Sequence, residues 1–357
     1  AFLKSKNTFS DAFLAYLSTF KFTGDIYSFV EGSIIFPNEP IITVKSNIIE
    51  AQLIETYLLQ TVNHQTLIAT KASRIKYSTN DRVVIEMGAR RAHGLTSSVN
   101  GARSAYIGGV DATSNVLADQ MYGVPSGGTM AHSWVQSFKT EYEAFKTYAA
   151  LYPTNTTLLV DTYNTLKSGI PNAIKVIKEE LLNNSEALYA VRIDSGDLAY
   201  LSKKARVLLD TAGLTQCKIV ASNSLDEYII KELLEQGAPI DVFGVGERLI
   251  TAKSDPVFGA VYKIVAKDYK NQIIPIIKIS DNVAKITTPH YKKVYRVYDE
   301  QQRAIADYLA IYDEVINISE PLVLFDPENP WKEKIVTKYT LKEMQVPIFL
   351  NGQQMYE

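Results

Sequence analysis

The pattern of apolar and polar positions changes character near residue 83. Before that point, the chain mixes a helix-like stretch with strand-like runs such as residues 41–44, separated by turn signals such as residues 32–33. Residues 52–74 carry apolar side chains at helical spacing and predict a long, partly buried helix. We therefore expect an N-terminal α+β domain over residues 1–82.

From residue 83 onward, short β-branched runs alternate with amphipathic stretches of helical spacing. A repeated strand–helix order implies parallel strands joined by right-handed crossovers. Both an open doubly wound sheet and a closed barrel satisfy this order. The runs are residues 83–85, 158–160, 190–193, 218–221 and 242–245.

The polar residues that follow these runs favour the barrel. Every run is followed at once by residues able to do chemistry, whereas in an open sheet only the strands at the switch point would be so equipped. We therefore predict an α/β fold: an irregular, TIM-like αβ barrel over residues 83–265 that carries the active site, beside the additional α+β domain. Residues 266–357 are expected to pack back on the N-terminal domain.

Composition and charge narrow the class of protein. The 357 residues carry 37 Lys+Arg and 39 Asp+Glu, a formal net charge of −2, so general binding to nucleic acid or an anionic membrane is not expected. No segment is apolar enough to predict a membrane span or a signal peptide. A single cysteine, Cys217, fits a reducing cytoplasm. Because the chain opens on Ala1 without a Met, we expect a longer protein, with the N-terminal domain truncated at its start.

One segment at a predicted strand end combines a cation, two carboxylates, a hydroxyl and a glycine. These are Arg192, Asp194, Ser195, Gly196 and Asp197. Such a set suits a phosphorylated, metal-bound polyol, because arginine binds phosphate and carboxylates bind Mg²⁺ or sugar hydroxyls. For Asp197 taken alone, a helix N-cap is the simpler interpretation.

A second segment, late in the predicted barrel, offers a backbone that can approach phosphate closely at Gly244 and Gly246. It is not a dinucleotide fingerprint, because Leu249 stands where that motif needs Gly or Ala. A tight strand-to-helix turn explains the two glycines equally well. On the preceding strand, Ser222 and Asn223 would add neutral donors, or cap the next helix.

Among the four histidines, only His132 is flanked by a Gly-rich loop with hydroxyls, residues 126–131. This setting suits a nucleophile that needs access to phosphate. Arg90 and Arg91 are more plausible ligands of an anion. No segment has zinc-site spacing, a GxSxG motif or a Walker loop.

Together these segments resemble the nicotinate phosphoribosyltransferase family of type II phosphoribosyltransferases. The resemblance implies transfer of phosphoribosyl from phosphoribosyl pyrophosphate to nicotinate, giving nicotinate mononucleotide and pyrophosphate in NAD salvage, with ATP hydrolysis and Mg²⁺. It also implies an irregular αβ barrel and a homodimer with active sites at the subunit interface. It rests on residues 63–75, 88–92, 128–133, 160–163, 192–197 and 244–246.

The resemblance assigns roles to individual residues. His132 falls on the family's phosphorylated histidine, Thr129 and Arg192 match positions that contact nicotinate, and position 247 matches one that contacts phosphoribosyl pyrophosphate. Such a transfer needs a stabilised oxocarbenium-like centre and a neutralised leaving group. We expect His132, Asp194 and Asp197 to be catalytic, with the two aspartates serving the ribose and the metal. Further substrate contacts are expected from Arg90, Asp161, Ser195, Gly196, Ser222, Asn223, Gly244, Gly246, Glu247 and Arg248; the metal ligands stay open.

The chain departs from the family at two points. It has no match to the family's N-terminal tyrosine motif, and Glu247 stands where the family usually carries Thr. A carboxylate there would repel phosphate oxygens unless Arg248 or Mg²⁺ compensates.

Three other functions remain open. A nicotinamide phosphoribosyltransferase would favour an acidic acceptor for the amide, and Asp111 lies next to the neutral residues 113–115. A barrel lyase with a Schiff-base lysine would need a strand that ends in Lys, which is absent from the runs above. A non-catalytic relic of the fold is supported only by the two departures.

Overall fold

The computed structural model describes residues 1–279, 286–326 and 329–356. Contacts divide the chain into two units, one of residues 1–59 with 261–357 and the other of residues 60–260. The division falls inside the long helix α3, Ile48–Ser78. The domain limits drawn from the sequence, at residues 82 and 265, stay predictions.

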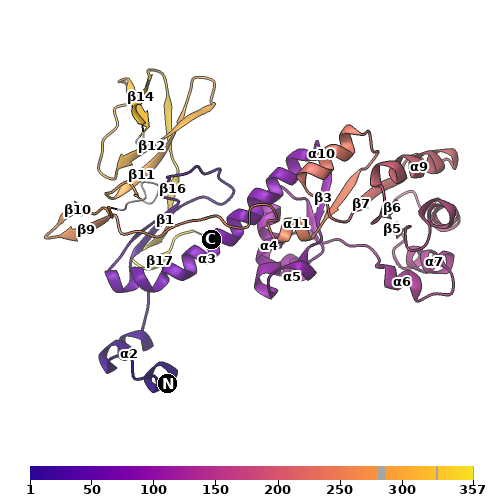
Figure 1. The fold of residues 1–357 in the computed structure, drawn as a ribbon, viewed down its shortest axis with the longest axis horizontal. Helices are drawn as coiled ribbons and strands as arrows, with labels where there is room; N and C mark the ends of the chain where they lie inside the picture. Colours follow the sequence, from indigo (N-terminus) through magenta and orange to yellow (C-terminus); the bar gives the residue numbers. More distant parts are fainter. Residues whose placement is uncertain (280–285, 327–328, 357) are drawn as a thin grey trace. The chain divides into compact units, whose positions relative to one another are not determined.

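The unit of residues 60–260 is built on a six-stranded sheet in the order β4-β3-β8-β7-β6-β5, with all neighbours parallel (Figure 1). The last strand, β8, pairs with the first, β3, as strands do when a sheet closes on itself. The sheet ends at β4 on one side and at β5 on the other, so the strands form an open half-barrel. The prediction of an irregular αβ barrel is thus confirmed. The strands are β3 Val83–Glu86, β4 Ala112–Thr113, β5 Asn155–Leu159, β6 Leu188–Ile193, β7 Lys218–Ser222 and β8 Val242–Val245.

Helices connect these strands, and several begin at a side chain that accepts a backbone N–H. Asn115, Thr140, Asp197 and Asp226 cap α5, α7, α9 and α10 in this way. The helices are η1 Ala89–Arg91, α4 Leu95–Ile107, α5 Val116–Tyr122, α6 His132–Gln136, α7 Glu141–Leu151, α8 Ile170–Val176, α9 Leu198–Thr211, α10 Glu227–Glu235 and α11 Glu247–Ile250; two π-helical turns, η2 Thr165–Gly169 and η3 Ile177–Leu181, flank α8.

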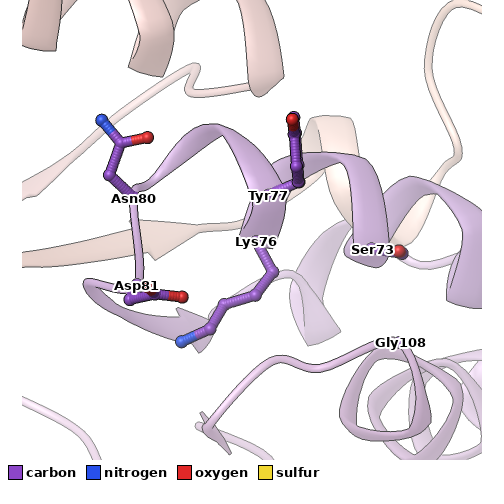
Figure 2. Close-up of a pocket in the computed structure, with 6 residues that line it drawn as sticks. All are labelled: Ser73, Lys76, Tyr77, Asn80, Asp81 and Gly108. Atoms are coloured by element: carbon purple, nitrogen blue, oxygen red, sulfur yellow. The ribbon is translucent and has the colours of Figure 1, made fainter.

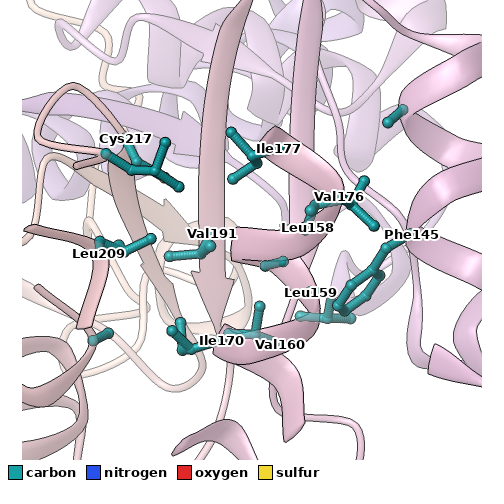
Figure 3. Packing of buried hydrophobic residues seen from close by; sticks show 14 of the residues in the cluster. Phe145, Leu158, Leu159, Val160, Ile170, Val176, Ile177, Val191, Leu209 and Cys217 are labelled. Atoms are coloured by element: carbon teal, nitrogen blue, oxygen red, sulfur yellow. The ribbon is translucent and has the colours of Figure 1, made fainter. Parts of the chain in front are cut away.

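The apolar core of this unit forms two clusters. In the first, Phe145 of α7 packs near Leu158 and Leu159 of β5, with Val191 of β6 and Cys217 further along (Figure 3). The second lies between α3, α10 and the strands β3 and β8. These clusters hold the strands that carry the polar residues, so the strand ends are placed on a rigid base.

The predicted long helix is present as α3, Ile48–Ser78, which extends beyond the expected residues 52–74 at both ends. Its start is fixed by polar contacts that the apolar pattern did not contain. Asn47 Oδ1 accepts the Glu50 backbone N–H at 3.0 Å, and the Glu50 carboxylate accepts the Thr23 backbone N–H at 2.7 Å. Burial favours the protonated form of Glu50, but hydrogen bonds donated to its carboxylate by Thr23, Asn47 and Ser46 outweigh burial and lower its pKa.

The unit of residues 1–59 and 261–357 is mainly antiparallel sheet. Residues 42–44 of the predicted run 41–44 lie in β2, Ile42–Lys45. The C-terminal strand β16, Gln345–Leu350, pairs with β1, Asp25–Phe29. The first sheet has the order β17-β16-β1-β2 and the second β12-β11-β15. The remaining elements are α1 Phe2–Ser5, α2 Asp11–Ser18, β9 Ala266–Tyr269, β10 Gln272–Pro275, β11 Lys292–Tyr298, β12 Ala304–Ile311, β13 Leu322–Asp326, β14 Asn329–Val336, β15 Thr340–Glu343 and β17 Gln353–Gln354.

A search of the described helices finds none with the length and apolar character needed to cross a bilayer.

Candidate active site

The polar residues predicted to lie at strand ends gather where β5, β6 and β7 end. These strands are parallel neighbours in the sheet, so their carboxyl ends share one edge. Asp161 follows β5, Asp194 follows β6, and Ser222 is the last residue of β7. Hydrogen bonds join all three residues into one network, described below.

Arg192 of β6 is the centre of this network. Its guanidinium donates from Nε to Ser222 Oγ at 2.8 Å, from Nη1 to Thr129 Oγ1 at 2.7 Å, and from Nη2 to Asp194 Oδ1 at 2.9 Å. Thr129 lies on the Gly-rich loop, 63 positions earlier in the chain. The structure therefore brings together the two residues that the resemblance matched to nicotinate, Thr129 and Arg192.

Asp194 is held as a carboxylate by its neighbours. Burial favours its protonated form, but hydrogen bonds from Ser222 and Arg192, together with the guanidinium charge, outweigh burial and lower its pKa. Ser222 Oγ donates to the same oxygen, Oδ1, that Arg192 contacts. The other oxygen, Oδ2, lies 3.7 Å from His132 Nε2.

His132 begins α6 and faces two carboxylates. Its Nε2 lies 3.7 Å from Asp194 Oδ2 and 3.9 Å from Asp161 Oδ1, while its Nδ1 is 3.0 Å from Thr162 Oγ1. The imidazole is 40% exposed, whereas the Asp161 side chain is 1% exposed. One ring nitrogen is thus oriented by Thr162 and the other is accessible beside negative charge, an arrangement that suits a phosphate-accepting histidine.

Asp161 fixes the turn after β6. Its Oδ2 accepts the Asp194 backbone N–H at 3.1 Å and the Ser195 hydroxyl at 2.5 Å. The next residue, Gly196, has φ +79°, a conformation that glycine adopts most easily. Asp197, exposed, accepts the Tyr200 backbone N–H at 2.9 Å and so caps α9. The N-cap interpretation of Asp197 is therefore what its observed contact supports.

The second predicted phosphate segment lies at the end of β8. Gly244 is a buried residue of that strand, opposite Ile85, and Gly246 precedes the short helix α11. Glu247, half exposed, has its carboxylate 3.7 Å from Arg91 Nε and 3.9 Å from Lys253 Nζ. Two cations thus lie beside this carboxylate, and neither is Arg248, which was expected to compensate it.

Arg248 instead forms an ion pair with Asp226, the N-cap residue of α10. Burial favours the protonated form of Asp226, but the hydrogen bond from the Ile229 backbone N–H, followed by the contact with Arg248, lowers its pKa. The predicted cap role for Ser222 or Asn223 on that helix is therefore taken by Asp226. Asn223 is exposed, with φ +88°. Arg90 is exposed on η1, next to Arg91.

Asp161 and Asp194 are candidate ligands for a divalent cation at this edge of the sheet. Among the described residues, no group of three or more His, Cys, Asp or Glu side chains is arranged to hold a metal ion. Asp161 Oδ1 is buried without a hydrogen-bond partner, on the side that faces His132. One or two carboxylates fit a Mg²⁺ that arrives with substrate phosphates, because Mg²⁺ usually keeps water and phosphate ligands.

Asp111, the acidic residue considered for an amide acceptor, lies away from this network. It immediately precedes β4, so it sits at the amino edge of the sheet, and its Oδ2 accepts from Lys76 Nζ at 2.7 Å and from the Val84 backbone N–H at 2.8 Å. Lys76 also lines a surface hollow of about 470 Å³ near the end of α3 (Figure 2). That hollow is bounded by Ser73, Lys76, Tyr77, Asn80, Asp81 and Gly108.

Sequence reasoning gave no role to Thr162 and Asp226. Thr162 directly follows Asp161 at the end of a predicted strand, and this position was the signal that could have marked it as a site residue. Asp226 carried the ordinary signature of a helix cap but lay outside every motif, and its contact with Arg248 depends on the packing of α10 beside α11.

Family models cover nearly all of the chain. The Nicotinate phosphoribosyltransferase (NAPRTase) family model matches residues 83–306, the corresponding N-terminal domain model matches residues 1–63, and the C-terminal domain model matches residues 291–357.

Curated relatives carry the same name. A nicotinate phosphoribosyltransferase of Bacillus subtilis is 49% identical over 332 residues, covering 93% of this chain and 67% of the relative. One from Mycobacterium tuberculosis is 45% identical over 295 residues, covering 83% of this chain and 62% of the relative. The chain thus spans about two thirds of the length of these relatives.

Solved structures agree with the fold. The crystal structure of human nicotinic acid phosphoribosyltransferase matches with a TM-score of 0.85 at 25% identity, covering all of this chain and 78% of the human chain. A nicotinate-nucleotide pyrophosphorylase from Pyrococcus furiosus matches with a TM-score of 0.74 at 25% identity, covering 94% and 77%. The barrel, the matched segments and these relatives together confirm the resemblance: the chain belongs to the nicotinate phosphoribosyltransferase family.

Proposed function

We propose that the enzyme to which this chain belongs transfers phosphoribosyl from phosphoribosyl pyrophosphate to nicotinate, giving nicotinate mononucleotide and pyrophosphate in NAD salvage, and couples the transfer to ATP hydrolysis through His132. The observation that carries the proposal is that His132 lies beside Asp161 and Asp194, and that Asp194 is hydrogen-bonded to Arg192, which also binds Thr129. Relatives named for this activity support it.

Arg192 and Thr129 would bind the nicotinate carboxylate. A guanidinium presents parallel N–H donors that match the two oxygens of a carboxylate, and its delocalised charge persists at any physiological pH. Thr129 Oγ1 lies 2.7 Å from Arg192 Nη1, so a carboxylate placed between them would replace one hydrogen bond with charge-assisted ones. Nicotinamide carries no negative charge, so Arg192 and Thr129 would bind it less tightly than nicotinate.

Asp194 would stabilise the positive charge that develops on the ribose. Departure of pyrophosphate leaves an oxocarbenium-like carbon, which a fixed carboxylate favours more in the transition state than in the substrate. The lowered pKa of Asp194 keeps it ionised, and its bonds to Arg192 and Ser222 fix its orientation before the substrate binds. Asp197 uses Oδ1 to cap α9, and its exposed carboxylate would offer the second oxygen, Oδ2, to the ribose or the metal.

Mg²⁺ bound to the pyrophosphate would neutralise the leaving group. Asp194 and the unpartnered oxygen of Asp161 are the carboxylate groups that would hold it at this edge of the barrel.

His132 would accept the γ-phosphoryl group of ATP. In the tautomer with its proton on Nδ1, the ring donates to Thr162 Oγ1 and the lone pair of Nε2 is free. Nε2 would form the N–P bond as the P–O bond to ADP breaks, and water would later release inorganic phosphate. Asp161 and Asp194, whose oxygens lie 3.9 and 3.7 Å from Nε2, would hold the ring in place during that release.

Nicotinamide phosphoribosyltransferase is the nearest alternative, and the contacts of Asp111 weigh against it. That carboxylate is engaged by Lys76 and by the Val84 backbone at the opposite edge of the sheet. The position of Arg192 favours an anionic substrate instead.

We also propose a homodimer in the cytoplasm, as the family resemblance implies. The single cysteine, buried Cys217, is compatible with a reducing compartment. Light scattering of the full-length enzyme would report the assembly, and a monomer that is fully active would contradict it.

The test is steady-state kinetics of the full-length enzyme and its His132→Ala variant. We expect ATP hydrolysis by the variant to fall by about 100-fold or more, because the covalent acceptor is lost, while ATP-independent transfer persists. Ser133→Ala, an exposed neighbour on α6, is the matched control and should behave as the wild type.

Undiminished ATP hydrolysis by His132→Ala would refute the phosphohistidine role. In parallel, the wild type is given nicotinate and nicotinamide, each with phosphoribosyl pyrophosphate. Equal turnover of the two substrates would refute the role of Arg192, and absence of turnover with either would support a non-catalytic relic.

A further inference from the structure

A buried carboxylate, Glu86, stands at the end of β3 and has no role in the chemistry described above. Its side chain is fully inaccessible to solvent. One oxygen, Oε2, accepts the Thr113 hydroxyl at 2.7 Å, and the other, Oε1, accepts the backbone N–H of Gly88. Both oxygens are therefore used inside the protein, and neither can contact a substrate.

The two partners of Glu86 belong to different connections. Thr113 ends β4, the neighbouring strand, and its Oγ1 also accepts the Asn115 backbone N–H at 3.0 Å, next to the cap of α5. Gly88 begins the turn that becomes η1. Glu86 thus joins the ends of β3 and β4 to the turn at Gly88.

That turn packs tightly against the turn after β8. A Cβ atom added at Gly88 would lie 2.7 Å from the Gly246 carbonyl oxygen and 2.8 Å from Glu86 Oε1. The backbone N–H of Met87 donates to the Val245 carbonyl at 2.8 Å. The turn after β3 therefore sits directly on the turn that holds Gly246.

These two turns carry the cations and the backbone groups expected to meet phosphate. Arg90 and Arg91 form η1, and Arg91 Nε lies 3.7 Å from the Glu247 carboxylate across the junction. A shift of the Gly88 turn would move both arginines and the backbone at Gly246 together, because Gly88 lies against the Gly246 carbonyl and the Ile250 side chain with no room for a Cβ atom. The strand ends that carry Arg192 and Asp194 lie farther along the sheet, on β6.

We propose that Glu86 is a positioning residue that sets the geometry of the phosphate-binding turns, residues 88–91 and 244–248, by joining Thr113 to the Gly88 backbone. The proposal rests on the proposed function, since it names the part of the substrate that these turns bind: the phosphate groups of phosphoribosyl pyrophosphate. It assigns Glu86 no contact with nicotinate and no step in the transfer.

Because burial raises the pKa of Glu86, against the opposing hydrogen bonds, a neutral side chain of the same shape is a natural substitute. In Glu86→Gln, the amide oxygen can accept the Gly88 N–H and the amide nitrogen can donate to Thr113 Oγ1. Both connections of residue 86 are kept without a charge, although the Thr113 hydroxyl now accepts from residue 86 and no longer donates to it. Glu86→Ala removes both bonds of Glu86. Thr113→Val removes the hydroxyl that donates to Glu86 Oε2 and accepts the Asn115 N–H, and it leaves the contact of Glu86 with Gly88 in place.

The experiment measures kcat, and KM for each substrate, in the full-length enzyme. We expect Glu86→Ala and Thr113→Val to raise KM for phosphoribosyl pyrophosphate by about 10-fold or more while KM for nicotinate changes by less than about twofold. Glu86→Gln should stay within about threefold of the wild type in every parameter. Calorimetric titration of each variant with inorganic pyrophosphate should show the same order of affinities.

Glu141→Gln is the matched control, because Glu141, at the start of α7, is a buried carboxylate of the same unit that accepts a hydrogen bond from Asn172 of α8. This variant should alter the midpoint of thermal unfolding without raising KM for phosphoribosyl pyrophosphate relative to KM for nicotinate. If Glu86→Ala does not fold, Thr113→Val and Glu86→Gln decide the question.

Three results would overturn the proposal. A loss of kcat in Glu86→Gln with both KM values unchanged would show that the charge takes part in the chemistry. An equal rise of both KM values, or a change in thermal stability alone, would reduce Glu86 to a structural residue. A separate outcome concerns the proposed function. If the wild type bound pyrophosphate but did not turn over nicotinate, the proposed function would fail, while the titrations would still test the role of Glu86.

Discussion

Arg192 shows how one residue can organise a site that several segments share. Its three hydrogen bonds reach a strand end, a carboxylate and a loop, and each uses a different nitrogen of the guanidinium. A lysine would offer one ammonium in place of this planar fork and could not hold Ser222, Thr129 and Asp194 in fixed directions at once. The geometry of the site therefore depends on arginine specifically, and not only on positive charge.

Glu247 is the residue whose substitution should improve the enzyme. Its carboxylate lies 3.7 Å from Arg91 Nε and 3.9 Å from Lys253 Nζ, at a place where phosphate oxygens are expected. Glu247→Thr would free both cations and remove a repulsive charge. Because exposed ion pairs contribute about 1 kcal/mol or less, we expect KM for phosphoribosyl pyrophosphate to fall by about three- to fivefold.

Steady-state kinetics at low and at physiological ionic strength would measure this change, which should shrink as salt screens the charges. Glu235→Thr, which removes another exposed carboxylate paired with a lysine, is the control. An increase in KM for Glu247→Thr would show that the carboxylate binds substrate, through Mg²⁺ or directly.

Among the elements, the segment of residues 34–39 is attached to the β11–β12 sheet by a hydrogen bond from Arg296. Arg296 Nη2 donates to the Ile34 carbonyl at 2.8 Å and also binds Asp307, and the Phe36 backbone N–H donates to Glu39 Oε2 at 2.8 Å. The other oxygen, Oε1, is buried without a hydrogen-bond partner. The Glu39 carboxylate therefore has a hydrogen-bond partner for only one of its two oxygens.

Burial, followed by the nearby Asp307, raises the pKa of Glu39 to about 7, against the opposing effects of the Phe36 N–H and Arg296. The folded state thus binds more protons than the unfolded state between pH 4.5 and about 7. Stability from this group is present at low pH and is lost as the pH rises through this range. Glu39→Gln, which is neutral at every pH, should unfold at a higher temperature than the wild type at pH 8.

Thermal unfolding followed by circular dichroism from pH 5 to pH 8 checks this prediction. The difference between variant and wild type should grow with pH. A constant difference, or one that decreases toward pH 8, would contradict the assignment. Glu143→Gln, on the exposed start of α7, is the control.

For the molecule as a whole, Cys217 is a probe of how the barrel unit opens. Its thiol lies in the main apolar cluster at 1% exposure, and burial raises its pKa to about 12. A buried, protonated thiol does not react with alkylating reagents. At pH 8 we expect alkylation to be slower in the folded protein than in guanidinium by about 1,000-fold or more, since it requires opening of this core.

The rate is followed by mass spectrometry of the labelled protein. A cysteine placed on the surface by Ser133→Cys, in a chain with Cys217→Ser, should react at the rate of the unfolded protein. Fast labelling of Cys217 under native conditions would show that β6 and β7 separate easily from α9.

The sequence predicted several features because their signals are local. The helix α3 and the strands β3 and β5 to β8 follow from apolar spacing, and Asp197 follows from the preference of aspartate for helix starts. The two-residue strand β4 gave no periodic signal. The contacts of Arg248 with Asp226, and of Glu247 with Arg91 and Lys253, could not be predicted, because each depends on which elements pack together.

The sequence by itself determined the alternation of strands and helices, the chemistry available at each strand end and the family to which the chain belongs. Only the tertiary structure decided that β8 pairs with β3, that Asp161 lies beside His132, and that Glu86 joins Thr113 to the turn at Gly88. The reason is physical. Periodicity reports backbone conformation and burial along a segment, whereas strand order and side-chain partners depend on packing between residues far apart in the chain.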